Sequence, residues 1–239
     1  MALQPSQIIG TTVEFEGKTV DAEGVMTFSF KPNHVKWTGG QYMVVLLPGA
    51  AFDRRSPLRP FSVSSSFSEG VLQITTRISD QPSVFKQKML ALKPGQKVYM
   101  SGPFGSFTLR DTNSSYVFIA GGIGVTPFRA ILNDCASRGV MPDITLLYAT
   151  NEQTPPFADE FNALAQRYPN FKLQYIQAPQ RVDADTIRAN VPEYSSKQFM
   201  VSGPPAMVKG VSQLLQAELA IPVAHIGKDA LKGYPWPLN

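Results

Sequence analysis

Residues 118–127 read Phe-Ile-Ala-Gly-Gly-Ile-Gly-Val-Thr-Pro, which predicts a buried strand, a glycine-rich turn and the start of a helix. Thr126 is placed to N-cap that helix, and Pro127 would take its first position, where a missing N–H costs nothing. Glycine at positions 121, 122 and 124 removes Cβ atoms that would keep a ligand away, and the exposed N–H groups favour a phosphate. The spacing is not G-x-G-x-x-G, and glycine can serve only a tight bend. On this stretch alone, nucleotide binding and a plain turn stay equally open.

Strand and helix patterns alternate around this turn, which predicts a doubly wound parallel sheet. Ligands collect at the carboxyl ends of such strands, so the turn and a second small-residue turn, Ser202–Pro205, can face one crevice. The alternative is that the two prolines simply start a helix. The predicted strands are Tyr116–Ala120, Ile144–Ala149, Lys172–Ile176, Gln198–Ser202 and Val223–Ile226.

The first half consists of short β-branched and aromatic runs separated by Gly, Pro and Asn, which predicts six strands forming a small closed or partly closed barrel. One helix is expected near Ser83–Leu92, and the polar stretch Arg110–Asn113 is typical of a linker. We therefore predict two domains, residues 1–110 and 111–239. The six predicted strands are Ile8–Phe15, Val25–Lys31, Gln41–Leu47, Pro60–Ser65, Val71–Ile78 and Lys97–Ser101.

The composition, with 43% hydrophobic and 17% charged residues in 239, excludes a disordered chain. The first residues lack a basic region followed by an apolar stretch, and no later run is long enough to span a bilayer, so we expect a cytoplasmic protein without a membrane span. One cysteine, Cys135, and two histidines exclude an internal disulfide, an iron-sulfur cluster and an ordinary zinc site. We expect no metal, and redox chemistry would need a bound organic cofactor.

The positive charge lies in the first half, where residues 1–110 carry 12 Lys and Arg against 7 Asp and Glu. Residues 111–239 carry 10 against 11. A basic first half fits an acidic protein partner or phosphate-bearing ligands, and equally well a lysine-rich solvated surface. We expect no nucleic-acid partner.

Several motifs occur in a shared order across nearly the whole chain, and together they resemble the ferredoxin-NADP reductase superfamily. Arg59-Pro60-Phe61-Ser62 resembles that family's Arg-x-Tyr/Phe-Ser motif. Each motif is weak alone, and their common order makes the resemblance strong. The other motifs are Gly40–Tyr42, Gly102–Phe107, the Gly-Gly-x-Gly-x-Thr-Pro turn Gly121–Pro127, Ser202–Met207 and Asp229–Tyr234.

The resemblance implies a six-stranded antiparallel FAD-binding β-barrel followed by a doubly wound parallel-sheet domain for the nicotinamide nucleotide. Its implied FAD-binding residues share the first domain. At the pyrophosphate they are Arg59, with Pro60 of the same motif, and the N–H groups around Ser83, Val84 and Phe85. At the flavin, Phe61 would lie against the ring or its ribityl chain, and Ser62 would lie near N5. Thr75 and Thr76 would lie along the ribityl side.

In the second domain the resemblance implies two groups of nucleotide-binding residues and a hydride transfer from nicotinamide C4 to flavin N5, achieved mainly by stacking the two rings. Ser62 and Ser202 are the implied catalytic residues. Electrons could then leave the flavin singly. Gly122, Gly124 and Thr126 would hold the dinucleotide, and Ser202, Gly203, Pro204 and Met207 would border the nicotinamide.

Two departures from the family pattern affect these expectations. The family often has cysteine where Ser202 stands, so only a hydroxyl hydrogen bond is possible there. Members that prefer NADPH usually carry a basic residue after the strand equivalent to Leu146–Tyr148, whereas this chain continues to the anionic Glu152. We therefore expect a preference for NADH, although Lys197 or Arg181 could compensate.

Three functions follow as hypotheses. The first is an electron-transfer reductase that passes electrons from NAD(P)H through FAD to a separate acidic carrier, such as ferredoxin or flavodoxin, or to a larger oxidoreductase partner. The second is a reductase of free flavin or ferric complexes, and the third is a non-catalytic flavin-binding subunit. A terminal aromatic, Tyr234 or Trp236, could cover the flavin as in some family members, or pack on the barrel surface.

Overall fold

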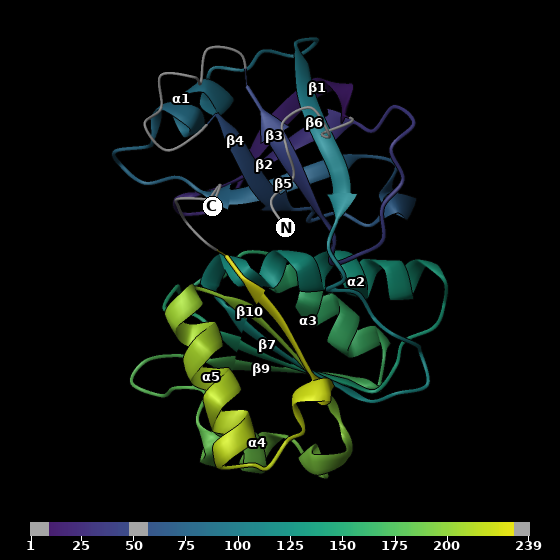
Figure 1. The fold of residues 1–239 in the computed structure, drawn as a ribbon, viewed down its shortest axis with the longest axis vertical. Coiled ribbons are helices and arrows are strands. Elements are labelled where there is room, and N and C mark those ends of the chain that lie inside the picture. The colour runs from purple at the N-terminus through teal and green to yellow at the C-terminus, as the bar shows by residue number, and fades with distance from the viewer. Residues whose placement is uncertain (1–9, 48–56, 232–239) are drawn as a thin grey trace.

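The computed structural model describes residues 10–47 and 57–231, and these form two sheets, one from each half of the chain (Figure 1). The first sheet is antiparallel and has six strands in the order β4-β3-β6-β1-β2-β5. The predicted six-stranded antiparallel unit is therefore confirmed. Its strands are β1 Gly10–Ala22, β2 Val25–Lys31, β3 Tyr42–Leu46, β4 Leu58–Ser62, β5 Leu72–Arg77 and β6 Lys97–Phe104.

The core of this unit lies on one side of the curved sheet. Alternate residues such as Phe28 and Phe30 point into it and are fully buried, as the period-two pattern of a strand requires. Helix α1, Val84–Leu90, covers one end of this core with buried Phe85 and Met89. The first turn of α1 is capped by Ser83, whose Oγ accepts from the Lys86 N–H at 3.4 Å.

Of the two predicted forms, a closed and a partly closed barrel, the structure has the partly closed one, because β4 and β5 are edge strands that share no ladder in the described chain. Past the end of β4, the Ser64 N–H donates to Gln73 O at 2.9 Å. The Ser65 hydroxyl then accepts from Gln73 N–H at 2.9 Å and donates to Val71 O at 2.8 Å. This side chain takes the hydrogen bonds that a continued ladder would make, so the sheet curls without closing.

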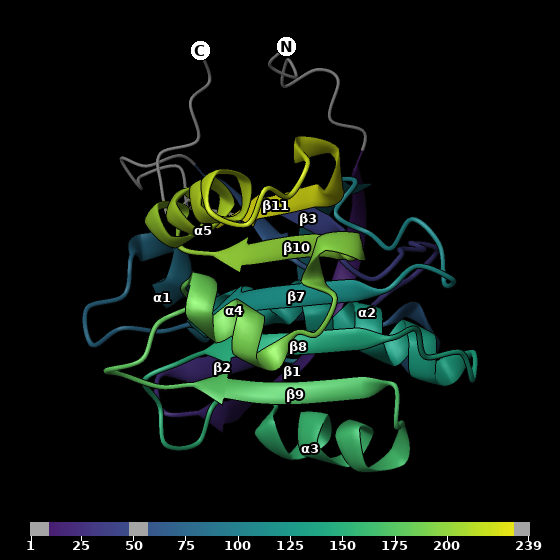
Figure 2. The same ribbon diagram turned by 90° about the horizontal axis from the view of Figure 1, so that it is seen from below.

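The second sheet is parallel, with the strand order β11-β10-β7-β8-β9. Figure 2 shows these strands side by side, with α4 and α5 in front of the sheet. Phe118 and Leu146 pack on the side of α2 and α3, whereas Ile119 and Leu147 pack on the side of α4 and α5. Burial on both faces confirms the doubly wound prediction. The elements are β7 Tyr116–Gly121, α2 Thr126–Ser137, β8 Ile144–Ala149, α3 Ala158–Arg167, β9 Phe171–Ile176, α4 Ala184–Asn190, β10 Gln198–Gly203, α5 Pro205–Ala217 and β11 Ile226–Ala230.

The last strand departs from its prediction at Val223–Ile226. Val223–His225 form a 3₁₀ turn, and the strand begins only at Ile226. As an edge strand, β11 carries Lys228 and Asp229, so its sequence lacks the apolar run that marks the inner strands. The other strand boundaries lie close to the prediction, except that β1 and β6 run further, to Ala22 and Phe104.

Helix α2 joins the two halves. Its Arg129 donates through Nη1 to Ser64 O at 2.7 Å and pairs through Nη2 with Glu69 at 2.9 Å. Its Asp134 accepts from the Gly39 N–H at 2.6 Å. These contacts fix the two sheets relative to one another, and the segment between Phe104 and Tyr116 contains the expected boundary after residue 110. No helix in the described ranges has the length and apolar character needed to cross a bilayer.

Candidate functional site

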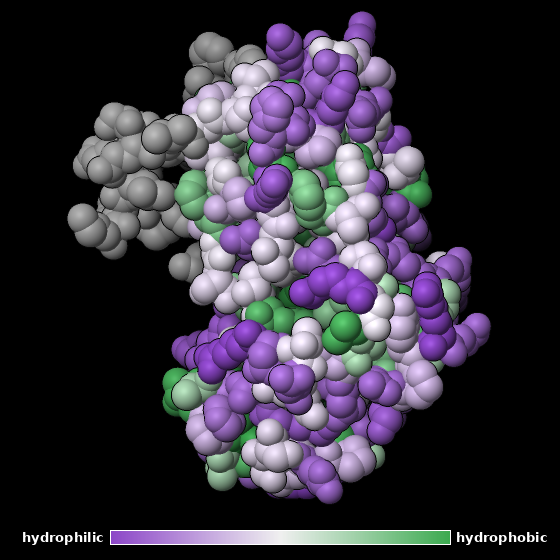
Figure 3. Space-filling model, turned by 90° about the vertical axis from the view of Figure 1, so that its right-hand side faces the viewer, coloured by the Kyte–Doolittle hydropathy of each residue, from purple (hydrophilic) through white to green (hydrophobic). Residues whose placement is uncertain are grey.

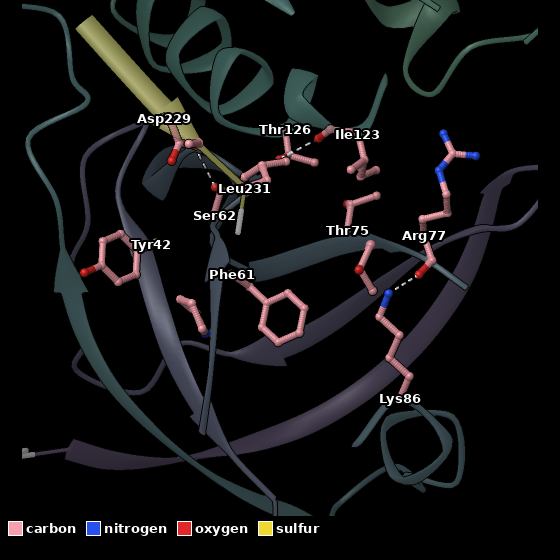
Figure 4. Close-up of a pocket in the computed structure, with 13 residues that line it drawn as sticks. Tyr42, Phe61, Ser62, Thr75, Arg77, Lys86, Ile123, Thr126, Asp229 and Leu231 are labelled. Atoms are coloured by element: carbon pink, nitrogen blue, oxygen red, sulfur yellow. Dashed lines mark hydrogen bonds between the residues drawn. The ribbon is translucent and has the colours of Figure 1, made fainter. Parts of the chain in front are cut away.

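A first cavity of about 360 Å³ opens between the two halves (Figure 4). Its volume falls within the ~300–1,000 Å³ typical of small-molecule sites. The antiparallel sheet supplies most of its wall, and the glycine-rich turn and β11 supply the rest. The lining residues are Tyr42, Pro60, Phe61, Ser62, Thr75, Thr76, Arg77, Lys86, Ile123, Thr126, Asp229, Ala230 and Leu231.

One wall of this first cavity is aromatic. The Phe61 ring stacks on Phe85, with ring centroids 5.9 Å apart and planes inclined by 29°. Behind it the Arg59 guanidinium lies 5.3 Å from the Phe85 ring centre, and the Arg59 side chain is fully buried. Arg59 and Phe85 therefore support Phe61 from the core and do not line the cavity.

Two cations share another part of the wall. The Lys86 ammonium donates to Arg77 O at 2.5 Å, as Figure 4 shows. Burial, and then the charge of Arg77, lower the pKa of Lys86. Cations whose charged forms are disfavoured in this way are stabilised by an anionic ligand, so this wall fits a phosphate-bearing molecule.

Ser62, Ser202 and Asp229 meet at the edge of the first cavity, although they lie on β4, β10 and β11. Ser62 donates to Asp229 Oδ2 at 3.4 Å, and Ser202 donates to the same oxygen at 3.3 Å. The parallel register that pairs Ser202 with Asp229 brings the second contact about. The structure therefore joins the two predicted catalytic serines through one carboxylate.

Asp229 was not among the predicted site residues. Burial raises the pKa of its carboxyl, and the hydrogen bonds from Ser202 and Ser62 only partly oppose that effect. A half-desolvated carboxyl in a cavity is typical of a functional group. The signal that could have identified it was its place at the head of the motif Asp229–Tyr234.

A second cavity of about 1020 Å³ lies at the carboxyl ends of the parallel strands. It is bounded by the glycine-rich turn, by Thr150–Glu152 after β8 and by Pro204, Pro205 and Met207 at the start of α5. The first and second cavities share Arg77, Ile123 and Leu231. A ligand in one would therefore lie next to a ligand in the other.

The three glycines of the turn have different surroundings. Gly122 has φ +51° and lines the second cavity, and a Cβ there would come only within 3.6 Å of the Arg77 guanidinium. A Cβ on Gly121 would lie 2.2 Å from Met207 Sδ. A Cβ on Gly124 would lie 2.4 Å from Ser202 O. Gly122 thus faces the ligand space, whereas Gly124 is required for packing against β10.

Thr126 does not N-cap α2, contrary to the prediction. Residues 122–125 form a 3₁₀ turn that runs directly into the helix, so Thr126 already has helical dihedral angles. Its hydroxyl donates to Ile123 O at 3.1 Å, and the residue lines the first cavity instead of the second. Pro127 accordingly stands one position further into the helix than expected.

Some of the remaining predicted residues line a cavity, and the others lie outside both linings. Pro60, Phe61, Ser62, Thr75 and Thr76 line the first cavity, and Gly122, Pro204 and Met207 line the second. Ser83 and Val84 at the start of α1, together with Gly124, Ser202 and Gly203, lie outside both linings. Tyr234 and Trp236 lie outside the described residues.

Comparison with known proteins agrees with this architecture. Residues 118–213 match the model of the oxidoreductase NAD-binding domain. Over 98% of its length the chain is 27% identical to the ferredoxin–NAD(P)(+) reductase component of the naphthalene 1,2-dioxygenase/salicylate 5-hydroxylase systems from Ralstonia sp., 72% of which is covered. These similarities agree with the resemblance of the chain's motifs to the ferredoxin-NADP reductase superfamily.

Two further proteins are similar to this chain, one in sequence and one in fold. The toluate 1,2-dioxygenase electron transfer component of Pseudomonas putida is 28% identical over 82% of this chain and 60% of its own length. The ferredoxin-NADP+ reductase of Plasmodium falciparum has the same fold, with a TM-score of 0.77 at 18% identity over 96% of this chain and 98% of that one. The chain thus spans only part of these curated relatives, 72% of one and 60% of the other.

Proposed function

We propose that this chain is a flavin-dependent NAD(P)H oxidoreductase that takes a hydride from NAD(P)H into FAD and passes electrons to a separate carrier such as ferredoxin or flavodoxin. The observation that carries this proposal is the wall of Arg77, Ile123 and Leu231 that the two cavities share. Hydride transfer needs two rings at reacting distance, and ligands in two adjoining cavities would lie next to one another.

FAD fits the residues of the first cavity. Phe61 offers an aromatic surface, and Ser62, Thr75 and Thr76 offer hydroxyl groups. Lys86 offers a cation, and a bound anion would raise its lowered pKa toward the ordinary value. When bound, FAD accepts a hydride and releases electrons one at a time. We assign the flavin end to this cavity and keep Arg59 and the start of α1 as the proposed support for the pyrophosphate.

The chain's own contribution at the reacting position is the group of Ser62, Ser202 and Asp229. The two hydroxyls orient the carboxyl from both sheets, and the raised pKa of Asp229 lets it keep a proton to higher pH than an ordinary aspartate. Tyr42, Ile123 and Leu231 exclude water beside it. These residues therefore hold and exchange a proton next to the hydride-transfer site.

Purification with added FAD tests the first part of this proposal. A yellow protein that anaerobic NADH or NADPH bleaches supports hydride transfer. A protein that takes up no FAD removes the flavin assignment, and a yellow protein that neither nucleotide bleaches removes the reductase assignment. Met207→Ala should weaken nucleotide binding and leave flavin content unchanged, because Met207 lines only the second cavity.

NADH is the proposed nucleotide. Thr150, Asn151 and Glu152 follow β8 and line the second cavity, and Glu152 pairs with Arg77. Of the two cations that could bind a 2′-phosphate, Lys197 is buried and paired with Asp143, whereas Arg181 lines the cavity. Glu152→Gln should raise the ratio of kcat/KM for NADPH to kcat/KM for NADH. Arg181→Gln should lower the same ratio. Equal use of both nucleotides by the unaltered protein would refute the preference.

The separate carrier is supported by the basic first half of the chain and by the names of its relatives, a ferredoxin–NAD(P)(+) reductase component and an electron transfer component. We place the reaction in the cytoplasm, where reduced pyridine nucleotide is supplied. Reduction of an added ferredoxin or flavodoxin by NADH, dependent on this protein, is the expected result. Activity with free flavin or ferric complexes and none with any carrier would favour the second hypothesis instead.

A further inference from the structure

A third cavity, of about 170 Å³, lies away from the two described above and shares no lining residue with either. It is reached at Tyr116, Gln198 and Gly227, near the beginnings of β7, β10 and β11. The second cavity lies at the other ends of these strands, about 15 Å along a strand of six residues. The third cavity is therefore distinct from the nucleotide site.

Its lining is rich in hydrogen-bond donors and contains no acidic residue. Arg110 and Lys228 contribute cationic groups, and Ser106, Thr108 and Gln198 contribute hydroxyl and amide groups. In the described part of the chain neither Arg110 nor Lys228 forms an ion pair, although Arg77, Arg129, Arg188 and Lys197 all do.

His225 belongs to the same lining and has an unsatisfied polar atom. Its Nδ1 is buried and, among the residues the structure describes, has no hydrogen-bond partner. A buried polar atom of this kind costs free energy unless a ligand or water pairs with it. Two unpaired cations and one unpaired imidazole nitrogen thus converge on a single small cavity.

We infer that the third cavity binds a compact oxyanion, held by Arg110, Lys228 and His225. Its volume is below the ~300–1,000 Å³ that drug-sized ligands need, so only a small anion or the anionic end of a metabolite fits. An arginine fork and an ammonium group are the usual partners of phosphate and carboxylate oxygens. Phe107 and Met200 provide an apolar part of the same lining.

The test follows backbone amide signals of the full, FAD-loaded chain by NMR during titration with inorganic phosphate and, separately, acetate, at ionic strength held constant with chloride. Saturating NAD+ occupies the second cavity. Phosphate or acetate should shift the amide signals of Ser106, Thr108, Gly227 and Lys228, and the anion that binds more tightly identifies a phosphate or a carboxylate ligand. Chloride alone should not shift them.

Lys228→Gln and Arg110→Gln should each weaken this binding at least about 10-fold, equivalent to about 1.4 kcal/mol. Lys209→Gln, at an exposed lysine on α5, is the matched control and should leave it unchanged. No shift at these amides, an equal response to chloride, or unchanged binding in both variants would overturn the inference. Signals of Gly121 and Gly122, which line the second cavity, report that cavity separately, so this result does not depend on the proposed reductase activity.

Discussion

At the scale of single residues, Asp229 makes a prediction about stability and pH. Its carboxyl is neutral in both folded and unfolded chains below its ordinary pKa of 3.8, and burial raises its pKa in the folded chain. Stability is therefore lost as the pH rises from the ordinary pKa through the folded-state pKa. Asp229→Asn, which stays neutral, should be more stable than the unaltered chain at pH 8, and the difference should vanish toward pH 4.

Urea unfolding of both proteins at pH 8 and pH 4 measures this difference. The same variant should also reduce the rate of flavin reduction by NADH, about 10-fold or more, because a proton-holding group at the site is lost. A variant that is less stable than the unaltered chain by equal amounts at both pH values would contradict the role of burial.

Gly124 makes a second prediction at this scale, based on close backbone approach. A Cβ at Gly124 would lie 2.4 Å from Ser202 O, and neither backbone segment can move without disturbing β10. Gly124→Ala should destabilise the chain by about 1–3 kcal/mol. The matched control is Gly210→Ala in α5, where the added methyl meets nothing within 4 Å and should be neutral or stabilising. Thermal unfolding of both variants decides the point, and equal effects would contradict it.

At the scale of elements, α2 carries the contact between the two sheets through Arg129. Its guanidinium pairs with Glu69 at 2.9 Å and with Glu160 at 2.8 Å, and it lies 5.1 Å from the Phe157 ring centre. Burial by itself would lower the pKa of Arg129, but the two carboxylates outweigh it and raise that pKa. The side chain is only 12% exposed, so its charge is weakly screened by water.

Arg129→Gln should therefore lower the free energy of unfolding by about 2 kcal/mol or more, since two part-buried carboxylates lose their partner. Arg188→Gln provides the control, because Arg188 pairs with Asp185 and is 47% exposed. That variant should cost less than about 1 kcal/mol. Urea unfolding measures the free energy of unfolding of both variants. Similar losses of this free energy would show that the contact of α2 with the first sheet does not depend on Arg129.

At the scale of the whole molecule, the excess of positive charge in residues 1–110 makes a prediction about the proposed carrier. Figure 3 shows one face on which hydrophilic residues cover most of both halves and hydrophobic residues form separate patches. Such a face offers no broad apolar area. We expect encounter with an acidic carrier to depend on electrostatic attraction, which salt screens over about 10 Å at 0.1 M.

Raising NaCl from low to high concentration should therefore slow reduction of an acidic carrier by about 10-fold or more. Reduction of a small neutral acceptor by the same protein should change little, because the proposed hydride transfer takes place inside the cavities. Stopped-flow measurement of both reactions separates the two effects. A carrier rate that is independent of salt would argue for a diffusible acceptor.

The fold could be predicted in large part because its elements are specified by neighbours in the chain. Buried runs such as Ile144–Ala149 and the alternation in Val25–Lys31 appear in the structure with the predicted bounds. The sequence left the structure open, or predicted it wrongly, where another hydrogen-bonding partner or an edge position replaces the local pattern. Hydrogen bonds of the Ser65 side chain take the place of backbone ladder bonds between β4 and β5. The charged edge strand β11 has no apolar run.

The sequence by itself determined the two units, their order and the glycine-rich turn, because strand and helix periods repeat within a few residues. Only the tertiary structure decided how the site is assembled. Ser62 meets Asp229 across 167 positions of the chain, and Arg77 meets Glu152 across 75. Such contacts depend on strand register and on the packing of one sheet against the other. The periodicity of the sequence contains no information about register or sheet packing. The contact of the Asp229 carboxylate with the two serines could therefore be found only in the tertiary structure.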